Sequence, residues 1–352
     1  MSRYFFTAAI FLATLISAFG SPLKSDEMVV FFPGYGSRVD AHTWELDVRG
    51  WIFEWERRPG VSTAFNKLLG IDKRALSTEE RALLNARTKL FLVDAERNKR
   101  LSIHIAGRVY ELKPSDVTGH FSDKITIADS EMVKVNNSVS FHAITKPGDT
   151  RTFAGTIQLI EPEGLSVISD LDDTIKVSNV LDRKKLLQNT FLKPFEPAAG
   201  MSALYQGWAT NSSVSFHYLS ASPSQLYTPL AEFLADHNFP LGSFHLRAFN
   251  WRTEFQNHSV PKKHKPAVLE NFMKKFPKRR FILVGDSGES DPEIYADLTR
   301  KFPERIEHIL IRDVTGESAE SARYREAFTS IDPAIWSIFK DPSEIARIPA
   351  EK

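Results

Sequence analysis

Three carboxylates stand close together in the segment Asp170–Thr174, whose sequence is Asp-Leu-Asp-Asp-Thr. Carboxylates at this spacing repel one another unless a cation lies among them, and Mg²⁺, which prefers oxygen ligands, is the natural one. Alternate side chains of an extended segment point to the same side, so we expect Asp170 and Asp172 to face one site. One carboxylate could attack phosphorus while its neighbour handles a proton. The alternative is a solvated acidic turn that caps the next helix.

Two further segments carry side chains that suit a phosphate group. Ser220 begins the run Ser220–Pro223, and its hydroxyl could hydrogen-bond a phosphate oxygen, although Ser-rich turns are common without any site. Lys265 ends the basic run Lys262–Lys265, where an ammonium could offset phosphate charge. A solvated basic loop is the alternative for that run.

A fourth segment, Gly285–Glu293, is rich in Gly and carboxylates. Asp286 suits a metal ligand, and Asp291 is placed to hold the ion or its waters. The glycine at 285 lets the backbone come close to such a site because it has no side chain.

Apolar runs that alternate with helical patterns surround these segments. This alternation predicts a doubly wound parallel sheet with helices on both faces. Ligands of such sheets bind beyond the carboxyl ends of the strands. The segments that begin at Asp170, Ser220 and Gly285 lie at such strand ends, and the lysine segment opens a helix. The expected strands are Leu165–Ser169, Val214–Leu219, Phe244–Leu246, Phe281–Val284 and Ile306–Ile311, and the expected helices include Leu226–Asp236 and Pro266–Phe276.

The chain before this region has the period of half-buried strands instead. Apolar and charged residues alternate in Trp44–Arg49, and similar short runs separated by turns continue to Ile160. One helical insertion is expected after Ser77–Glu80, which resembles a capping box. We therefore expect an all-β, sandwich-like domain over 21–162 and the α/β domain over 163–340, divided at the turn-rich Glu161–Gly164.

The N-terminus indicates export. Arg3 precedes the almost wholly apolar run Tyr4–Phe19, and the small residues Ala18 and Gly20 suit a signal peptidase, so we predict a signal peptide over 1–20 that is cleaved after Gly20. The protein would then be secreted or periplasmic. An uncleaved signal anchor is the alternative. No later apolar run is long enough to span a membrane, so we expect no transmembrane span after signal removal.

Composition excludes some classes of protein. The chain contains no cysteine, so disulfides, a thiolate nucleophile and Cys-ligated metal are excluded. Its net charge is +1, which provides no overall attraction to nucleic acid, and we expect no nucleic-acid partner.

Taken together and in this order, the four segments resemble the haloacid dehalogenase superfamily. More closely, they resemble the phosphatidate phosphatase catalytic-domain family related to the lipins, over about residues 165–314. Only about fifty residues separate Asp170 from Ser220, which leaves room for a minimal cap and no large lid on a Rossmann-like sheet. The segments that carry the resemblance are Asp170–Thr174, His217–Pro223, His264-Lys265 and Gly285–Glu293.

The resemblance implies roles for both aspartates of the first segment. Asp170 would be the nucleophile and a magnesium ligand, and it would carry an aspartyl-phosphate intermediate. Asp172 would be the general acid/base and would bind the ion through its backbone carbonyl. Related lipid-binding domains without activity lose the second aspartate, and this chain keeps it.

The resemblance also implies the rest of the site and the substrate. Thr174 would orient the loop and, with Ser220 and Lys265, hold the phosphoryl group, while Asp286 and Asp291 would complete the Mg²⁺ site. The substrate would be phosphatidate or a related lipid phosphate at a membrane surface, converted to diacylglycerol and phosphate. The alternatives are a phosphatase for soluble or protein phosphates, a lipid-phosphate-binding module without turnover, and a binding function of the β-domain.

Two segments could contact a membrane directly. Thr190–Phe195 mixes aromatic residues with a lysine, and ordinary core packing of Phe191 and Phe195 is the alternative that we favour. The basic stretch Lys274–Arg280 could touch anionic headgroups, but we favour a helix C-terminus with a suitable charge.

Overall fold

A computed structural model of the protein describes residues 21–56, 70–210, 214–249 and 263–345. The chain forms two compact units, one of Met1–Arg57 with Leu92–Leu159 and one of Arg58–Phe91 with Ile160–Lys352. The domains expected from the sequence are continuous, whereas the second compact unit also contains the helical insertion. The predicted signal segment, residues 1–20, lies outside the described residues.

The first unit is built on a nine-stranded sheet, and every pairing with a described register in it is antiparallel. Strand β4 has β2 and β3 along one edge and β9 along the other. A separate parallel ladder joins β1 to β6. The strands of this unit are β1 (Ser21–Pro22), β2 (Glu27–Phe32), β3 (Gly34–Arg38), β4 (Thr43–Glu54), β5 (Asp94–Ala95), β6 (Lys99–Arg100), β7 (Ser102–Ile105), β8 (Arg108–Glu111), β9 (His120–Ala128), β10 (Ser138–Ala143) and β11 (Ala154–Ile160).

The expected alternation of apolar and charged residues is confirmed in β4. Trp44, Leu46 and Val48 are buried in the apolar cluster of the unit, while the charged residues between them remain partly exposed. Period-2 burial of this kind is what a strand with one face on a core produces. The strand-rich pattern before residue 160 therefore identifies a mostly antiparallel sheet correctly.

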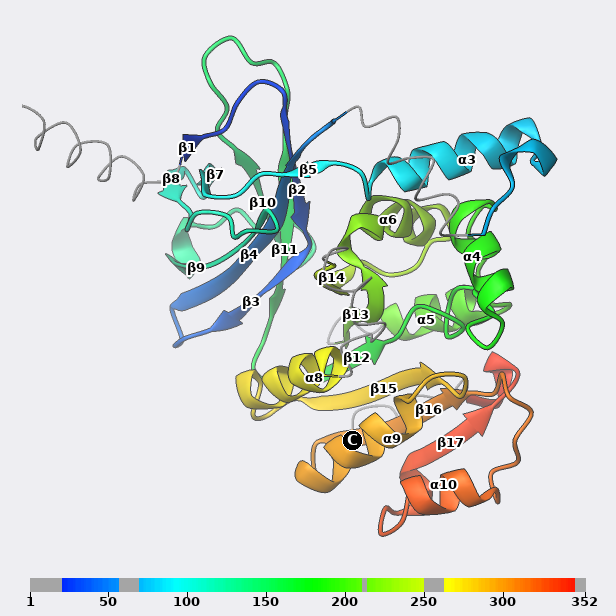
Figure 1. Ribbon diagram of the computed structural model, residues 1–352. Helices are drawn as coiled ribbons and strands as arrows, with labels where there is room; N and C mark the ends of the chain where they lie inside the picture. Colours follow the sequence, from blue (N-terminus) through cyan, green and yellow to red (C-terminus); the bar gives the residue numbers. More distant parts are fainter. Residues whose placement is uncertain (1–20, 57–69, 211–213, 250–262, 346–352) are drawn as a thin grey trace, which may run out of the picture. The chain divides into compact units, whose positions relative to one another are not determined.

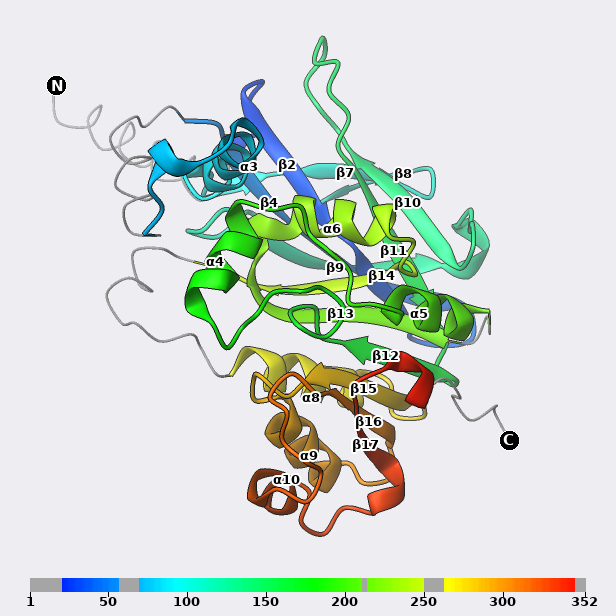
Figure 2. The same ribbon diagram turned by 90° about the vertical axis from the view of Figure 1, so that its right-hand side faces the viewer.

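The second unit contains a six-stranded sheet whose neighbouring strands all run parallel. In Figure 2 the strands follow one another in the order β14, β13, β12, β15, β16, β17. All five expected strands are present, and no pattern predicted the short edge strand β17. The strands are β12 (Leu165–Ser169), β13 (Val214–Pro223), β14 (Gly242–Arg247), β15 (Arg280–Asp286), β16 (Ile306–Arg312) and β17 (Trp336–Phe339).

Helices cover both faces of this sheet (Figure 1). Phe216 of β13 lies in an apolar cluster with Tyr205 and Phe233, which come from α5 and α6. The next residue, His217, points to the other face and packs against Phe272 of α8 with the ring centroids 4.4 Å apart. The helices of the unit are α3 (Thr78–Lys89), α4 (Arg183–Phe191), α5 (Met201–Ala209), α6 (Tyr227–Asp236), α8 (His264–Lys275), α9 (Asp291–Lys301) and α10 (Ala322–Ala327).

The insertion folds as predicted and packs against α4. Ser77 and Glu80 form both hydrogen bonds of a capping box at the start of α3. Arg87 of α3 donates to the carbonyl oxygens of Thr190 and Lys193, each at 2.7 Å. These carbonyls lie at and beyond the C-terminus of α4, where unpaired carbonyls attract a cation. Burial lowers the pKa of Arg87 to about 10, so it stays charged at neutral pH.

The buried side chain of Arg279 connects the segment before β12 to the start of the parallel sheet. Its side chain is 1% exposed. The guanidinium donates to the carbonyl oxygens of Glu161 and Leu165 and to the hydroxyl of Ser166. A buried cation surrounded by acceptors holds the segment before β12 in place, because moving that segment would leave the charge unsatisfied.

Among the residues that the structure describes, no helix combines the length and the apolar composition that crossing a bilayer requires.

We predict that Arg279→Ala destabilises the protein by about 3 kcal/mol, because several backbone and hydroxyl acceptors lose a charged donor at once. The measurement is the free energy of unfolding in urea. Arg280→Ala is the matched control, since Arg280 is half exposed and, among the described residues, forms a surface ion pair with Glu307 alone. Equal destabilisation by both changes would contradict the role given to Arg279.

Candidate active site

The aspartate segment forms a tight loop at the end of β12. Asp170 is bound to the neighbouring strand through its backbone N–H, which donates to the carbonyl of Val284 at 2.8 Å. Thr174 turns back and its hydroxyl donates to Asp170 Oδ2 at 3.3 Å. Asp170 and Thr174 are both buried. The loop therefore fixes the Asp170 carboxylate from two sides.

Three carboxylates from different elements meet at this point. Asp170 follows β12, Asp286 ends β15 and Asp291 begins α9, and one oxygen of each lies within 4.8 Å of the other two. All three side chains are buried. Strands β12 and β15 are parallel neighbours, so their carboxyl ends coincide and place Asp170 beside Asp286. The predicted meeting of these three residues at the end of the sheet is confirmed.

A lysine and a fourth carboxylate complete the cluster. Lys265 Nζ, in the first turn of α8, lies 3.0 Å from Asp170, 2.6 Å from Asp291 and 3.0 Å from Glu289. Four carboxylates against one ammonium give a net charge of 1 − 4 = −3 when all are ionised. One lysine cannot balance that charge, and a divalent cation would reduce it to −1.

The excess of negative charge shifts the pKa values of the carboxylates and of the lysine in the cluster. Burial raises the pKa of Asp170, and the charge of Asp291 adds to the rise while Lys265 opposes it. Burial also raises the pKa of Asp286, with Asp291 and Glu289 adding to the effect. The carboxylates in turn outweigh burial at Lys265 and hold its pKa well above the usual range. The lysine is therefore permanently charged, and the carboxylates need further positive charge to ionise fully.

Two oxygens of the cluster fit a metal ion. Asp170 Oδ1 and Asp286 Oδ2 are buried and accept no hydrogen bond from the described residues, and only the first has a cation beside it, Lys265 Nζ at 3.0 Å. Oxygens of this kind are costly to bury without a partner, and Mg²⁺ takes carboxylate oxygen in preference to other ligands. Asp170, Asp286 and Asp291 would hold such an ion.

Asp172 faces a different set of groups. Lys176 Nζ lies 2.7 Å from its carboxylate, and the hydroxyls of Ser178, Ser220 and Ser222 donate to it at 2.6, 3.2 and 2.7 Å. Burial alone would raise the pKa of Asp172, but the charge and hydrogen bond of Lys176, with the hydroxyls, hold it below the usual range. Asp172 is therefore ionised at neutral pH.

Asp173 is buried and holds the loop that follows it, and the helix cap expected as the alternative for this segment is supplied by Asp182 instead. The Asp173 carboxylate accepts the backbone N–H groups of Ser178, Asn179 and Val180 at 2.7, 2.8 and 2.6 Å. Its own backbone has φ of 52°, in the left-handed region that a tight turn requires. Arg312 donates to its carbonyl at 2.7 Å. Asp173 thus shapes the loop and takes no part in the cluster.

The structure brings the predicted site residues into two adjoining groups. Asp170, Thr174, Lys265, Asp286 and Asp291 lie at the acidic cluster, and Ser220 lies with Asp172. Sequence reasoning missed four groups: Lys176, Ser178 and Ser222 around Asp172, and Glu289 beside Lys265. Lys176 stands four residues after Asp172, a spacing that could have drawn attention to it, whereas Ser222 reaches Asp172 only through the parallel pairing of β13 with β12.

Both segments proposed as membrane contacts have other partners. Phe191 and Phe195 are buried, with Phe195 in the apolar cluster of the sheet, so core packing is confirmed. In the basic stretch, Lys274 pairs with Glu270 and Lys278 pairs with Glu163, while Arg279 is internal. These contacts favour the structural interpretation of the stretch.

Comparison with known proteins agrees with the position of this site. Residues 165–313 match the family described as phosphatidate phosphatase APP1, catalytic domain. Phosphatidate phosphatase APP1 of Saccharomyces cerevisiae is 37% identical over 158 residues, which is 44% of this chain and 26% of that protein. An uncharacterized protein of Schizosaccharomyces pombe is 28% identical over 279 residues, 74% of this chain and 44% of that protein. The chain thus spans less than half the length of either relative.

Among solved structures, a 2,6-sialyltransferase of Photobacterium sp. JT-ISH-224 is similar at 9% identity, covering 62% of this chain and 37% of that one. The TM-score of 0.23 is too low to support any conclusion about fold or function.

We predict that Mg²⁺ raises the melting temperature of the protein and that Asp286→Asn abolishes the increase. Asparagine can still accept the N–H groups of Gly288 and Glu289, which Asp286 Oδ1 accepts at 2.7 and 3.1 Å, but it removes one ligand charge. With chelator the variant should be at least as stable as the wild type, because it removes a buried repulsive carboxylate. If Mg²⁺ is present at a hundred times its Kd, its binding should raise the free energy of unfolding by about 2.7 kcal/mol.

The control for this measurement is Asp297→Asn, which changes an exposed carboxylate of α9 that pairs with Arg300 and lies outside the cluster. If Mg²⁺ stabilises Asp286→Asn as much as it stabilises this control, the cluster does not bind the ion.

We also predict that Gly285→Ala disrupts the cluster. An added Cβ at 285 would lie 2.4 Å from Asp291 Oδ2 and 2.6 Å from Asp291 Cβ, closer than atoms can approach. The Mg²⁺-dependent rise in melting temperature should disappear. Gly207→Ala in α5 is the control, since nothing lies within 4 Å of its added Cβ and alanine favours a helix by about 0.5–1 kcal/mol. An unchanged Mg²⁺ response in Gly285→Ala would contradict the prediction.

Proposed function

We propose that this protein is a Mg²⁺-dependent phosphatase of phosphatidate or a related lipid phosphate. The premise is that residues 165–313 belong to the phosphatidate phosphatase APP1 catalytic-domain family. The family makes this domain a phosphoric monoester hydrolase. The lipid substrate, the metal and the roles of individual residues are the proposal. The observation that carries it is the buried cluster of Asp170, Asp286 and Asp291, in which Asp170 Oδ1 and Asp286 Oδ2 accept no hydrogen bond and a single lysine contacts the first of them.

Asp170 is the proposed nucleophile. An oxygen of its carboxylate forms a bond to phosphorus while the bond from phosphorus to the diacylglycerol oxygen breaks, which leaves an aspartyl-phosphate. For this step Asp172 must carry a proton, which it takes from water in the second step of the preceding turnover and passes to the leaving oxygen. Lys265, whose Nζ lies 3.0 Å from Asp170 Oδ1, offsets the charge of the phosphoryl group. A bound Mg²⁺ would supply further positive charge at this point.

Asp172 is the proposed base of the second step. Its ionised carboxylate, held by Lys176, can take a proton from the water that attacks the aspartyl-phosphate, so that phosphate leaves and Asp170 is restored. Ser220 and Ser222 point their hydroxyls at the same carboxylate and are placed to move to a phosphate oxygen. The ionised Asp172 also weighs against a module that binds lipid phosphate without turnover.

The proposed fold is of the haloacid dehalogenase type with a minimal cap. The parallel sheet, with the proposed nucleophile directly after β12, supports this fold. The minimal cap is supported by the short connection between Asp170 and Ser220, in which α4 and α5 are the described helices. A site of this kind can accept a phosphate that projects from a membrane surface.

We further propose that the protein is exported and that residues 1–20 are removed. This rests on the apolar run Tyr4–Phe19 and the small residues that follow it. N-terminal sequencing of protein recovered from outside the cytoplasm should begin at Ser21. A recovered chain that begins at Met1 would support an anchor instead.

The test of the proposed function is phosphate release from phosphatidate in mixed micelles. Mg²⁺ should support release, chelator should stop it, and Asp170→Asn should reduce it below detection. Asp172→Asn should retain the fold and lose about 10²–10⁴-fold in rate, the contribution typical of a positioned acid/base. Asp297→Asn, outside the site, serves as the control and should match the wild type.

Aryl phosphate and a phosphopeptide measured in parallel decide the substrate class. Release from these alone would keep the mechanism and overturn the lipid assignment. No release from any of the three would overturn the proposed activity.

A further inference from the structure

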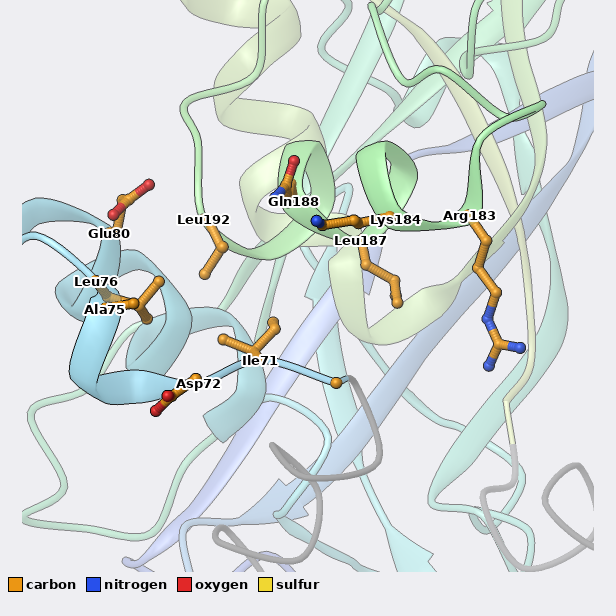
Figure 3. Close-up of a pocket in the computed structure, with 11 residues that line it drawn as sticks. Ile71, Asp72, Ala75, Leu76, Glu80, Arg183, Lys184, Leu187, Gln188 and Leu192 are labelled. Atoms are coloured by element: carbon orange, nitrogen blue, oxygen red, sulfur yellow. The ribbon is translucent and has the colours of Figure 1, made fainter.

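A pocket of about 720 Å³ lies between the insertion and α4, all within the second unit. Its volume falls in the range of about 300–1,000 Å³ that small-molecule sites occupy. One wall comes from the segment before and at the start of α3, and the other from α4. Figure 3 shows Ile71 and Leu187 pointing toward each other across it, with Leu192 further along. We call this feature the α4 groove.

The α4 side of the groove carries cations in an unfavourable place. Arg183, Lys184 and Lys185 occupy the first turn of α4, which contains no acidic residue. The helix dipole is positive there and disfavours cations, which are normally found at the other end of a helix. Asp182 caps the backbone N–H groups of Lys184 and Lys185, so the dipole is only partly relieved. An anion bound at this end would offset both the dipole and the side-chain charges.

The two cations that line the groove have no acidic partner among the residues that the structure describes. Arg183 and Lys184 are exposed, and neither forms an ion pair with any residue in the described parts of the chain. The acidic residues of the opposite wall are already engaged at helix starts. Asp72 accepts from Arg74 N–H at 3.0 Å and Glu80 accepts from Ser77 N–H at 2.8 Å. The charged lining residues Asp72, Glu80, Arg183 and Lys184 sum to zero, but the charges are separated, and the two cations lie together on the α4 side.

The groove adjoins the catalytic loop through a short stretch of chain. Val180 is fixed by Asp173, and Arg183 follows three residues later, so their Cα atoms are at most about 11 Å apart. Asn189 of α4 also donates to the carbonyl of Ser178 at 3.1 Å. Leu181, between the two sites, is 61% exposed. An exposed leucine beside a cationic helix start is typical of a surface that meets a lipid interface.

We propose that the α4 groove binds an anionic phospholipid of the membrane, with its phosphate at Arg183 and Lys184 and an acyl chain along Ile71, Leu187 and Leu192. This site is separate from the acidic cluster and holds a lipid that is not consumed. It would keep the catalytic loop at the membrane while substrate molecules exchange. That catalytic consequence rests on the proposed function, whereas lipid binding itself does not.

The test is binding of the full chain to vesicles of phosphatidylcholine with and without phosphatidylglycerol, neither of which is a phosphate monoester. The wild type should bind only the anionic vesicles. Arg183→Gln with Lys184→Gln should weaken binding by about 30-fold, which corresponds to about 1 kcal/mol for each of two cations near an anionic surface. Leu187→Gln should weaken it by about tenfold without changing the charge, because an apolar contact is lost.

The matched control is Lys274→Gln with Lys278→Gln, which removes the same charge from the basic stretch whose lysines are paired with acids. It should bind as the wild type does. Equal loss in the control and the groove variant would show that net charge alone drives binding and would overturn the proposal. Displacement of vesicles by soluble glycerol phosphate would likewise overturn it, because the occupant would then be a free phosphate ester.

Two activity measurements separate this inference from the proposed function. The double groove variant should hydrolyse soluble aryl phosphate at the wild-type rate and phosphatidate in anionic vesicles more slowly. If the wild type shows the vesicle-binding pattern but releases no phosphate from phosphatidate, the groove stands and the proposed substrate fails. If phosphatidate is hydrolysed equally by wild type and variant, and binding is unchanged, the groove proposal fails and the function stands.

Discussion

The parallel-sheet unit is organised around an excess of buried negative charge. Lys265 pairs with the buried Asp170 and Asp291 and with the partly buried Glu289, and the buried Asp286 lies beside the same two aspartates. A buried carboxylate without such a partner would be costly. The excess of negative charge keeps Lys265 protonated by raising its pKa, and it also makes the binding of a divalent cation favourable. Because β12 and β15 are hydrogen-bonded neighbours, the sheet forces Asp170 and Asp286 together and the side chains cannot separate to relieve the repulsion.

The loop that carries Asp170 and Asp172 separates two kinds of electrostatic environment over two residues. Asp170 lies among carboxylates, which raise its pKa, while Asp172 lies among a lysine and hydroxyls, which lower its pKa. Asp173 keeps the loop in this shape by accepting three backbone N–H groups. Neighbouring carboxylates can therefore serve as nucleophile and base because the tertiary structure gives each a different surrounding charge.

The helical insertion has a part in the catalytic unit although it interrupts the β-rich region in the sequence. Arg87 fixes it to the end of α4 and lies over the ring of Phe195, 3.8 Å from the centroid. The insertion thereby becomes one wall of the α4 groove, and the other wall is the helix that follows the catalytic loop. The α4 wall of the groove thus follows directly in the chain from the loop that carries Asp170.

The sequence by itself determined the local features. The apolar runs predicted five of the six strands of the parallel sheet, and the capping box predicted α3. The positions of Asp170, Lys265, Asp286 and Asp291 relative to those elements predicted a common acidic site. These are properties of short segments, for which period and spacing are sufficient. The same logic separated the strand-rich region from the α/β region.

The tertiary structure alone decided which groups surround each of these residues. Ser222 and Lys176 come to Asp172, and Glu289 comes to Lys265, through strand register and loop geometry that spacing in the sequence does not encode. The sequence did not predict that the insertion belongs to the second unit, because this follows from contacts between distant segments: Arg87 donates to the carbonyl of Thr190, and Phe91 packs against Phe191. Contacts between distant segments follow from packing, and packing is a property of the whole folded unit and not of any one segment.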